Sequence, residues 1–314
     1  MNKKWSFLLV AVMFVLAAAP AHAAPFPAKD ITIVHPGTAG SPVDILTREL
    51  ARSIHELTGV NVNVSNVSGG AGGAAMGTVM SAPTDGYTWG LLTSANLIPL
   101  RGPLASNFPF KNFTWVAKIQ EDTFGITVLA DSSFKTLDDL AAYAKANPGQ
   151  LLMGGNGSGS GFHLGALKTG KEMGFDFRYV PFEAGPEVLT ALLGGHVQVV
   201  NATLTATRPF VKAGQARMLV ATGDRRPFPD TPTYGELGVD NSFSMWRGIF
   251  LRTGVDPAIV QAISDLLRKA TLTDSFVEYM KSFEFEDVFM DHAEFTISVL
   301  NEFENLAVTM QLLN

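Results

Sequence analysis

The chain of 314 residues contains no cysteine. Disulfide bonds, cysteine catalysis and attachment of a lipid to a cysteine thiol are therefore excluded. The histidines form no H-x-H or H-E-x-x-H pair, and no G-x-S-x-G elbow is present, because each serine in the stretch 157–161 has glycine directly beside it. These absences lead us to expect no bound metal ion, no cofactor and no enzyme activity.

Long apolar runs are missing except at the N-terminus. There, Lys3 and Lys4 precede the apolar run 5–19, and Ala21-His22-Ala23 follows as a small-x-small site. This pattern predicts a secretory signal peptide, residues 1–23, cleaved after Ala23 to leave 314 − 23 = 291 residues. Since no later stretch is long and apolar enough to cross a bilayer, we expect a freely soluble exported protein.

Positive charge is also scarce. The formal net charge is −6, and it becomes −6 − 2 = −8 once Lys3 and Lys4 are removed. That charge argues against nucleic acid and anionic membranes as partners, so any anion must be bound locally. A mature chain of about 290 residues is near the size at which one core splits into two, which predicts two domains.

Predicted strands and helices alternate along the chain, which is the α/β pattern. The strand 31–34 leads through a loop of small residues, 35–42, into a helix with apolar residues at helical spacing. A second loop of this kind, 154–161, follows the strand 151–153 in the other half. Backbone N–H groups at the start of a helix lack intrahelical partners and lie at its positive end. The pair of loops therefore predicts an anion site between the two halves, whereas the plainer alternative is two tight strand-to-helix turns.

A third glycine-rich stretch, 68–77, contains a G-x-G-x-x-A string at Gly70, Gly72 and Ala75. It follows the second strand, and no acidic residue ends a strand about twenty residues later, so dinucleotide binding is disfavoured. The third predicted strand, 88–92, ends in the small polar run 93–96. Such residues lie where open α/β sheets bind ligands.

Several motifs, in this order and spacing, resemble the substrate-binding receptors of tripartite tricarboxylate transporters, also called Bug receptors. They are Val34-His35-Pro36 with Gly40 and Asp44, Ala82-Pro83-Thr84-Asp85-Gly86-Tyr87-Thr88, Lys111-Asn112-Phe113-Thr114, Phe134-Lys135-Thr136-Leu137-Asp138-Asp139-Leu140, Tyr179-Val180-Pro181-Phe182, Ala191-Leu192-Leu193-Gly194-Gly195 and Pro229-Asp230-Thr231-Pro232-Thr233. The resemblance covers nearly the whole mature chain.

The resemblance implies an α/β, two-lobed periplasmic binding protein of type II-like fold with a ligand cleft between the lobes. It implies a monomeric receptor that closes on a small mono- or dicarboxylate and delivers it to the membrane subunits of the transporter. The first lobe is expected to comprise residues 24–122 and about 228–270, and the second residues 123–227 and about 271–314.

Matching positions supply the expected ligand-binding residues. In the first lobe these are Thr38, Ala39, Gly40, Ser41, Asp44, Thr93, Ser94 and Asn96. In the second lobe they are Asn156, Gly157, Ser158, Ser160, His163, Phe182, Glu183 and Thr203. For Asp44, a structural role in holding the loop is the alternative. The chain departs from the family at Gly37, where an aromatic residue is usual, and at Ser41 and Pro42, where glycines are usual; Pro42 removes a backbone donor.

Two other functions remain open at this point. One is an exported serine hydrolase that uses Ser158 or Ser160 as nucleophile and His163 as base, although no carboxylate is evident to orient the ring. The other is a ligand-sensing receptor that serves a sensor kinase, which uses the same cleft.

Overall fold

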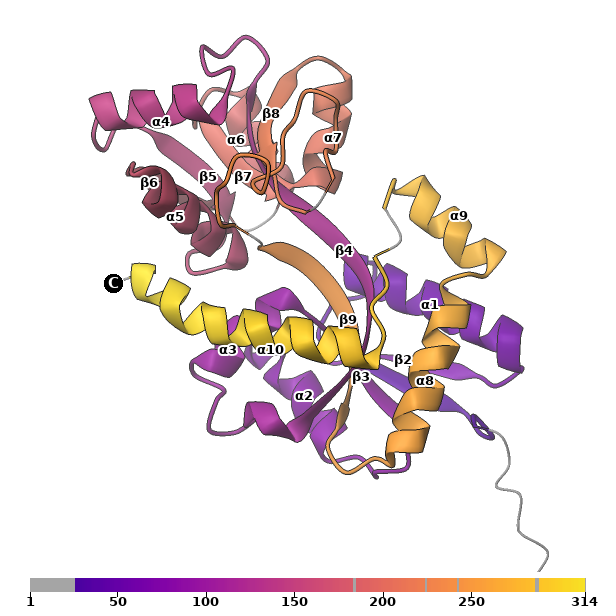
Figure 1. Cartoon of the computed structure of the whole chain (residues 1–314). Helices are drawn as coiled ribbons and strands as arrows, with labels where there is room; N and C mark the ends of the chain where they lie inside the picture. The colour runs from indigo at the N-terminus through magenta and orange to yellow at the C-terminus, as the bar shows by residue number, and fades with distance from the viewer. Residues whose placement is uncertain (1–25, 183–184, 224, 242, 286–287, 314) are drawn as a thin grey trace, which may run out of the picture.

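The polypeptide forms two lobes, one above the other in Figure 1, that are joined by long strands. The structure is a computed structural model and describes residues 26–182, 185–223, 225–241, 243–285 and 288–313. The predicted signal peptide, residues 1–23, lies outside these ranges. In the described part of the chain, no helix is both long and apolar enough to cross a membrane.

Strands and helices alternate as the sequence predicts. The first part comprises β1 (Ile31–His35), α1 (Pro42–Thr58), β2 (Val62–Asn66), α2 (Gly73–Met80), β3 (Thr88–Thr93), α3 (Leu97–Arg101) and β4 (Phe113–Leu129). The middle part comprises α4 (Leu137–Ala146), β5 (Leu152–Asn156), α5 (Gly161–Met173), β6 (Arg178–Phe182), α6 (Gly185–Leu193), β7 (Val199–Thr203), α7 (Leu204–Lys212) and β8 (Ala216–Ala221). The last part comprises β9 (Ser244–Arg252), α8 (Pro257–Ala270), α9 (Asp274–Ser282) and α10 (His292–Thr309). Short 3₁₀ turns lie at Gly70–Gly72, Ser94–Asn96, Phe110–Asn112 and Met310–Leu313.

Side-chain caps determine where the helices begin. The hydroxyl of Ser41 accepts from the Asp44 N–H at the start of α1, and Pro42 occupies the first turn, where its missing N–H is not needed. The hydroxyl of Ser160 accepts from the His163 N–H in the same way at α5. At α4, Thr136 and Asp139 form a reciprocal capping box.

β4 belongs to both lobes. Its residues 113–123 pair antiparallel with β9, and its residues 124–129 pair with β7 and β8. On the first side the strand order is β2-β1-β3-β9-β4, with β1, β2 and β3 parallel to one another; on the second side β7, β5 and β6 follow. One sheet of nine strands therefore runs through the described chain, and Figure 1 shows β4 crossing from one lobe to the other.

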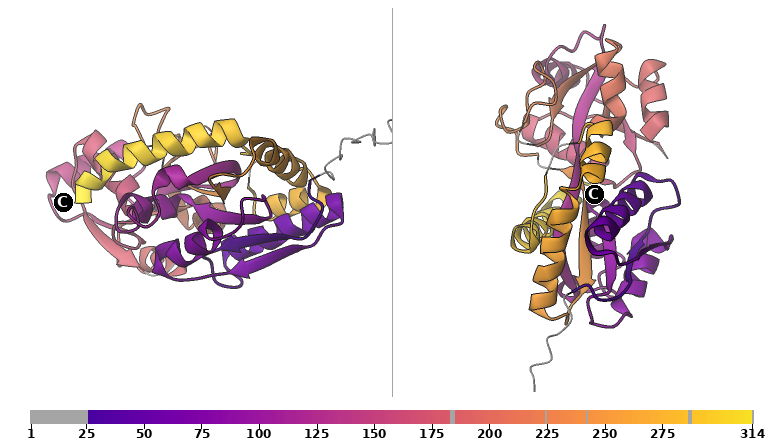
Figure 2. Two further views of the ribbon diagram at one scale, coloured as in Figure 1. Left: turned by 90° about the horizontal axis from the view of Figure 1, so that it is seen from below. Right: turned by 90° about the vertical axis from the view of Figure 1, so that its right-hand side faces the viewer.

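Each lobe buries apolar side chains on both faces of its part of the sheet. In the first lobe, α1, α8 and α9 cover one face around Trp89 and Leu50, and α2, α3 and α10 cover the other around Trp115 and Phe250. In the second lobe, α4 and α5 cover one face, while α6 and α7 cover the other. Figure 2 shows α10 running along the outside of the molecule toward the second lobe.

The packing of residues 271–314 differs from the expectation that they belong to the second lobe. Phe276 and Tyr279 of α9 are buried with α1 and β1, and Phe295 of α10 is buried with β3 and β9, all in the first lobe. Conversely, Tyr234 is buried in the second lobe. The chain therefore returns to the first lobe at β9, which pairs with β3 and β4, and the later helices α8, α9 and α10 pack there.

Candidate ligand-binding cleft

The carboxyl ends of the parallel strands in each lobe point toward the other lobe. Thr93, at the end of β3, pairs with Arg247 of β9, and Thr203, at the end of β7, pairs with Phe124 of β4. Both pairs lie near the middle of β4, where the strand passes between the lobes. The loops that follow these strands therefore line the facing edges of the two lobes.

Asp44 is buried beneath the first loop and is hydrogen-bonded to it. Its carboxylate is almost fully buried and accepts from the Gly40 N–H at 2.9 Å, the Asn66 Nδ2 at 2.8 Å and the Arg48 Nε at 3.0 Å. The hydrogen bonds from Arg48 and from the Gly40 N–H lower the pKa of Asp44 well below its usual range. These contacts favour a structural role for Asp44 in holding the loop, which was the alternative that the sequence left open.

His35, at the end of β1, is buried beneath the same loop in its neutral form. Its Nδ1 accepts from the Gly37 N–H at 3.1 Å, so that nitrogen carries no proton. Its Nε2 lies 3.4 Å from the Asp44 carboxylate. Burial lowers the pKa of His35 despite this neighbour. The ring therefore positions the loop and keeps no charge for a ligand.

The expected residues after β3 are largely used within the protein. Asn96 forms a capping box with Thr93, and its Nδ2 donates to the Ala71 carbonyl at 3.3 Å, which ties this turn to the glycine-rich stretch 69–72. Ser94 is buried, and its hydroxyl donates to the Ser244 carbonyl at 2.7 Å. These residues shape the floor of the cleft.

The second loop is built around His163 and Tyr179. The two rings stack with centroids 3.9 Å apart, and His163 Nδ1 accepts from the Gly159 N–H at 3.1 Å. The Asn156 carbonyl accepts from the hydroxyls of Ser160 and Tyr179. Burial lowers the pKa of His163 and raises that of Tyr179, so both rings are neutral near pH 7. The loop begins later than predicted, because residues 154–156 continue strand β5.

The remaining expected residues lie at neighbouring strand ends. The Phe182 carbonyl accepts from the Gly157 N–H, and the Thr203 hydroxyl caps α7. Glu183 lies outside the described residues. Ser158 and Gly157 are exposed, as are Thr38, Ala39 and Gly40 in the first loop.

Both loops keep main-chain donors without protein partners. In the part of the chain described, no hydrogen bond uses the N–H groups of Thr38, Ala39 and Val43 in the first loop, or of Ser158, Gly161 and Phe162 in the second. These groups surround the first turns of α1 and α5. The arrangement therefore offers an anion main-chain N–H groups and two positive helix ends in place of a cationic side chain.

Among the described residues, no hydrogen bond joins the two loops. The hydrogen bonds of each loop stay within its own lobe. Nearer to β4 the lobes do meet, because Ser94 and Gly161 line a small common cavity of about 10 Å³ together with Phe124 and Glu302. That cavity has room for about one water molecule, so a ligand requires the outer part of the cleft.

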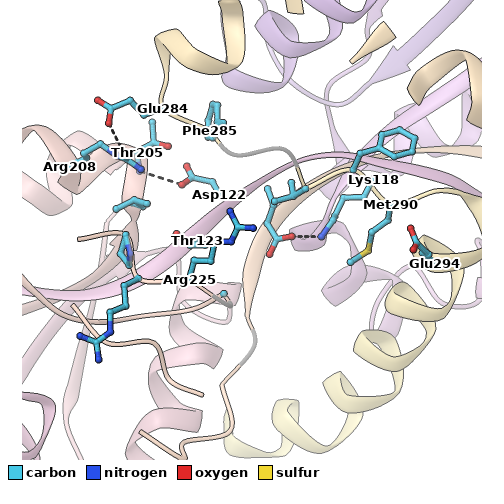
Figure 3. Close-up of a pocket in the computed structure, with 17 residues that line it drawn as sticks. Lys118, Asp122, Thr123, Thr205, Arg208, Arg225, Glu284, Phe285, Met290 and Glu294 are labelled. Carbon is cyan, nitrogen blue, oxygen red and sulfur yellow. Dashed lines mark hydrogen bonds and ion pairs between the residues drawn. The ribbon is translucent and has the colours of Figure 1, made fainter. Parts of the chain in front are cut away.

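The sequence gives no hint of a larger cavity, about 610 Å³, on the α9 side of β4. None of the expected site residues lines it. Its wall comes from both lobes and carries charges of both signs (Figure 3): Lys118, Glu121, Asp122, Thr123, Leu204, Thr205, Arg208, Gly223, Arg225, Arg226, Pro227, Glu284, Phe285, Val288, Phe289, Met290 and Glu294. Its lining lacks the unpaired helix ends described above, so we place the candidate site at the loops.

The geometry expected of a serine hydrolase is missing at the second loop. The Ser160 hydroxyl donates to the Asn156 carbonyl, and the His163 ring bonds the Gly159 N–H. Among the described residues, neither ring nitrogen of His163 is hydrogen-bonded to Ser158 or Ser160. A serine is therefore not paired with a base here.

A family model, relatives in sequence and solved structures all match this chain over most of its length. Residues 46–307 match the model of the family described as the tripartite tricarboxylate transporter family receptor. The UPF0065 protein in the gbd 5′ region of Cupriavidus necator is 34% identical over 287 residues, which cover 89% of this chain and 86% of that protein. Among solved structures, the TctC solute-binding protein from Polaromonas, without ligand, has a TM-score of 0.82 at 24% identity and covers 92% of this chain and 99% of its own. R. palustris Rpa4515 with adipate has a TM-score of 0.72 at 24% identity, covering 92% and 98%.

Proposed function

This chain belongs to the tripartite tricarboxylate transporter receptor family, and from that premise we propose that it is a periplasmic receptor that captures a small mono- or dicarboxylate between its lobes and delivers it to the membrane subunits of such a transporter. The observation that carries the proposal is the set of unpaired N–H groups at the starts of α1 and α5. A structural relative holds adipate, a dicarboxylate.

Binding follows from the geometry in two steps. A carboxylate first meets the exposed donors of one loop, where the helix end stabilises its charge. The second lobe then rotates about β4 and β9 and brings its own donors to the other end of the ligand. No bond is made or broken, so the protein acts as a carrier and not as an enzyme.

The proposal is tested by thermal-shift and calorimetric titration of the ligand-stripped mature protein with mono- and dicarboxylates, amino acids and nucleotides. A ligand at a hundred times its Kd adds about 2.7 kcal/mol of stability, which shifts Tm by several degrees. We expect shifts from carboxylates alone. A shift from a nucleotide or an amino acid, with none from the mono- and dicarboxylates, contradicts the proposal.

Ser41→Asp locates the site. Aspartate retains the ability to cap α1 but places a negative charge in the first loop, so we expect carboxylate affinity to fall by about tenfold or more while Tm changes little. Ser106→Asp is the matched control, since Ser106 is an exposed serine on the surface after α3. Equal affinity in both variants argues against this cleft.

Delivery is tested separately, by uptake of the bound acid into vesicles that contain the two membrane subunits.

A further inference from the structure

Glu284, the second residue after the end of α9, occupies an unusual backbone position. Its φ is +55°, in the left-handed region that normally favours glycine. Side chains other than glycine persist in this region when the surrounding structure holds them there. The contacts of the Glu284 side chain are therefore the place to look for what holds this backbone conformation.

Two cations of α7 hold that carboxylate. Arg208 Nη1 lies 2.6 Å from Oε2 of Glu284, and Lys212 Nζ lies 2.6 Å from Oε1. Both carboxylate oxygens are engaged, and Figure 3 shows the bond from Arg208. These ion pairs lower the pKa of Glu284, so the carboxylate is charged throughout the neutral range.

Glu284 belongs to one lobe, and its two partners Arg208 and Lys212 belong to the other. α7 packs in the second lobe through Ala206 and Phe210. Glu284 follows α9, whose Phe276 and Tyr279 are buried in the first lobe. By contrast, the pair Arg226–Glu236 lies in the second lobe and the pair Lys29–Asp85 in the first. The ion pairs of Glu284 thus connect the two lobes, whereas these other two pairs do not.

The start of α7 is also fixed to the crossing strand. The Thr205 N–H donates to Oδ1 of the buried Asp122 in β4 at 3.3 Å. A rotation of the second lobe about β4 therefore moves the far end of α7, with Arg208 and Lys212, relative to Glu284. The ion pairs lengthen or break in proportion to that movement.

We propose that Glu284, Arg208 and Lys212 form an inter-lobe latch that holds the lobe angle of this structure and is released when the lobes close. The effect of the latch on ligand affinity rests on the proposed function, whereas its effect on the lobe angle does not. Ion pairs at an exposed surface are weak, but a two-state balance between lobe angles responds to small differences. Loss of the latch lowers the cost of closure and tightens carboxylate binding by about two- to fivefold.

The test measures the distance between the lobes without any ligand. Because the chain has no cysteine, spin labels can be placed at Ser81→Cys in the first lobe and Lys171→Cys in the second, both exposed positions. The distance distribution is compared among the labelled parent, Glu284→Gln and Glu236→Gln. Glu236 is a matched control, because its side chain is as exposed as that of Glu284, 44%, and its ion pair stays within one lobe.

We expect the distribution to shift or broaden in Glu284→Gln and to match the parent in Glu236→Gln. In 1 M NaCl, where charges are screened within about 3 Å, the parent should approach the Glu284→Gln distribution. Identical distributions for parent and Glu284→Gln at low salt overturn the latch. If the distance distribution shifts in Glu284→Gln but no carboxylate binds, the latch stands and the proposed function fails. If Glu284→Gln binds a carboxylate more weakly than the parent, the latch does not oppose closure.

Discussion

Asp44 links the chemistry of the first loop to its stability. Three donors converge on its buried carboxylate, and one of them, the Gly40 N–H, belongs to the loop itself. Asparagine at this position would keep one acceptor oxygen. Its NH₂ group would take the place of the other oxygen and would point at groups that are themselves donors. Removing the charge therefore leaves polar groups without partners beneath the loop.

Asp44→Asn should lower the free energy of unfolding at pH 7 by about 1–3 kcal/mol and weaken carboxylate binding, because the loop loses its support. Denaturant unfolding and titration measure the two effects. Asp85→Asn is the control: Asp85 pairs with Lys29 at the surface, so the change should cost less than about 1 kcal/mol. An Asp44→Asn protein as stable as the parent contradicts the structural role.

The difference in the free energy of unfolding between the parent and Asp44→Asn should depend on pH. The native pKa of Asp44 is lower than in the unfolded chain, so its stabilisation is present above about pH 4 and is lost as pH falls through the native pKa. The parent and Asp44→Asn should therefore converge in stability at strongly acid pH.

At the scale of the element, close approach between strands constrains β3. Gly90 lies opposite Phe250 of β9, and a Cβ atom at position 90 would come within 2.0 Å of that ring. Gly77, in contrast, lies within α2, where a Cβ atom would have its nearest neighbour at 3.8 Å.

Gly90→Ala should destabilise the protein by about 1–3 kcal/mol, because Phe250 is buried and must move. Gly77→Ala should instead stabilise it by about 0.4–1 kcal/mol, since alanine restricts the unfolded chain and favours the helix. Thermal unfolding of both variants checks the pair. Destabilisation by both changes to a similar degree would show that glycine matters here for reasons other than the Phe250 contact.

Local signals predicted most elements correctly, and long-range pairing explains the failures. The expected strand-to-helix loops are present, and local caps at Thr136 and Asp256 begin helices α4 and α8. β9 was not predicted. Its run Ser244–Arg252 contains Gly248 and the buried Arg247 and shows no alternation, because both of its faces are buried, Ile249 and Leu251 in one core and Trp246 and Phe250 in the other. At the site, residue types indicated the loops, but the roles of His35 and Asn66 depend on contacts between distant segments.

At the scale of the whole molecule, Glu302 joins α10 to β9 at the junction of the lobes. Its carboxylate accepts from Trp246 Nε1 at 2.5 Å and lines the small cavity beside Gly161. Burial raises the pKa of Glu302 to about 7, with Glu121 adding to the rise and Lys118 opposing it. The native state therefore retains a proton that the unfolded chain releases near pH 4.5.

Because the native pKa of Glu302 is raised, the contribution of Glu302 to protein stability should decline as pH rises from about 4.5 to 7. Glu302→Gln keeps an acceptor for Trp246 without the charge, so it should stabilise the protein at pH 8 by about 1–3 kcal/mol and have little effect near pH 4.5. Unfolding of both proteins between pH 4 and 9 checks this. A constant difference across that range contradicts the assignment to Glu302.

The shared strand β4 also has a consequence for the order of assembly during synthesis. The second lobe draws its strands from β4 to β8, a continuous stretch that ends at Ala221. The first lobe needs β1 to β3 from early in the chain and β9, α8, α9 and α10 from its last third. Contacts between distant parts of a chain form slowly, so the second lobe should fold first and the earliest segments should wait for the last residues. Removal of α10 would then leave a folded second lobe attached to an unfinished first one.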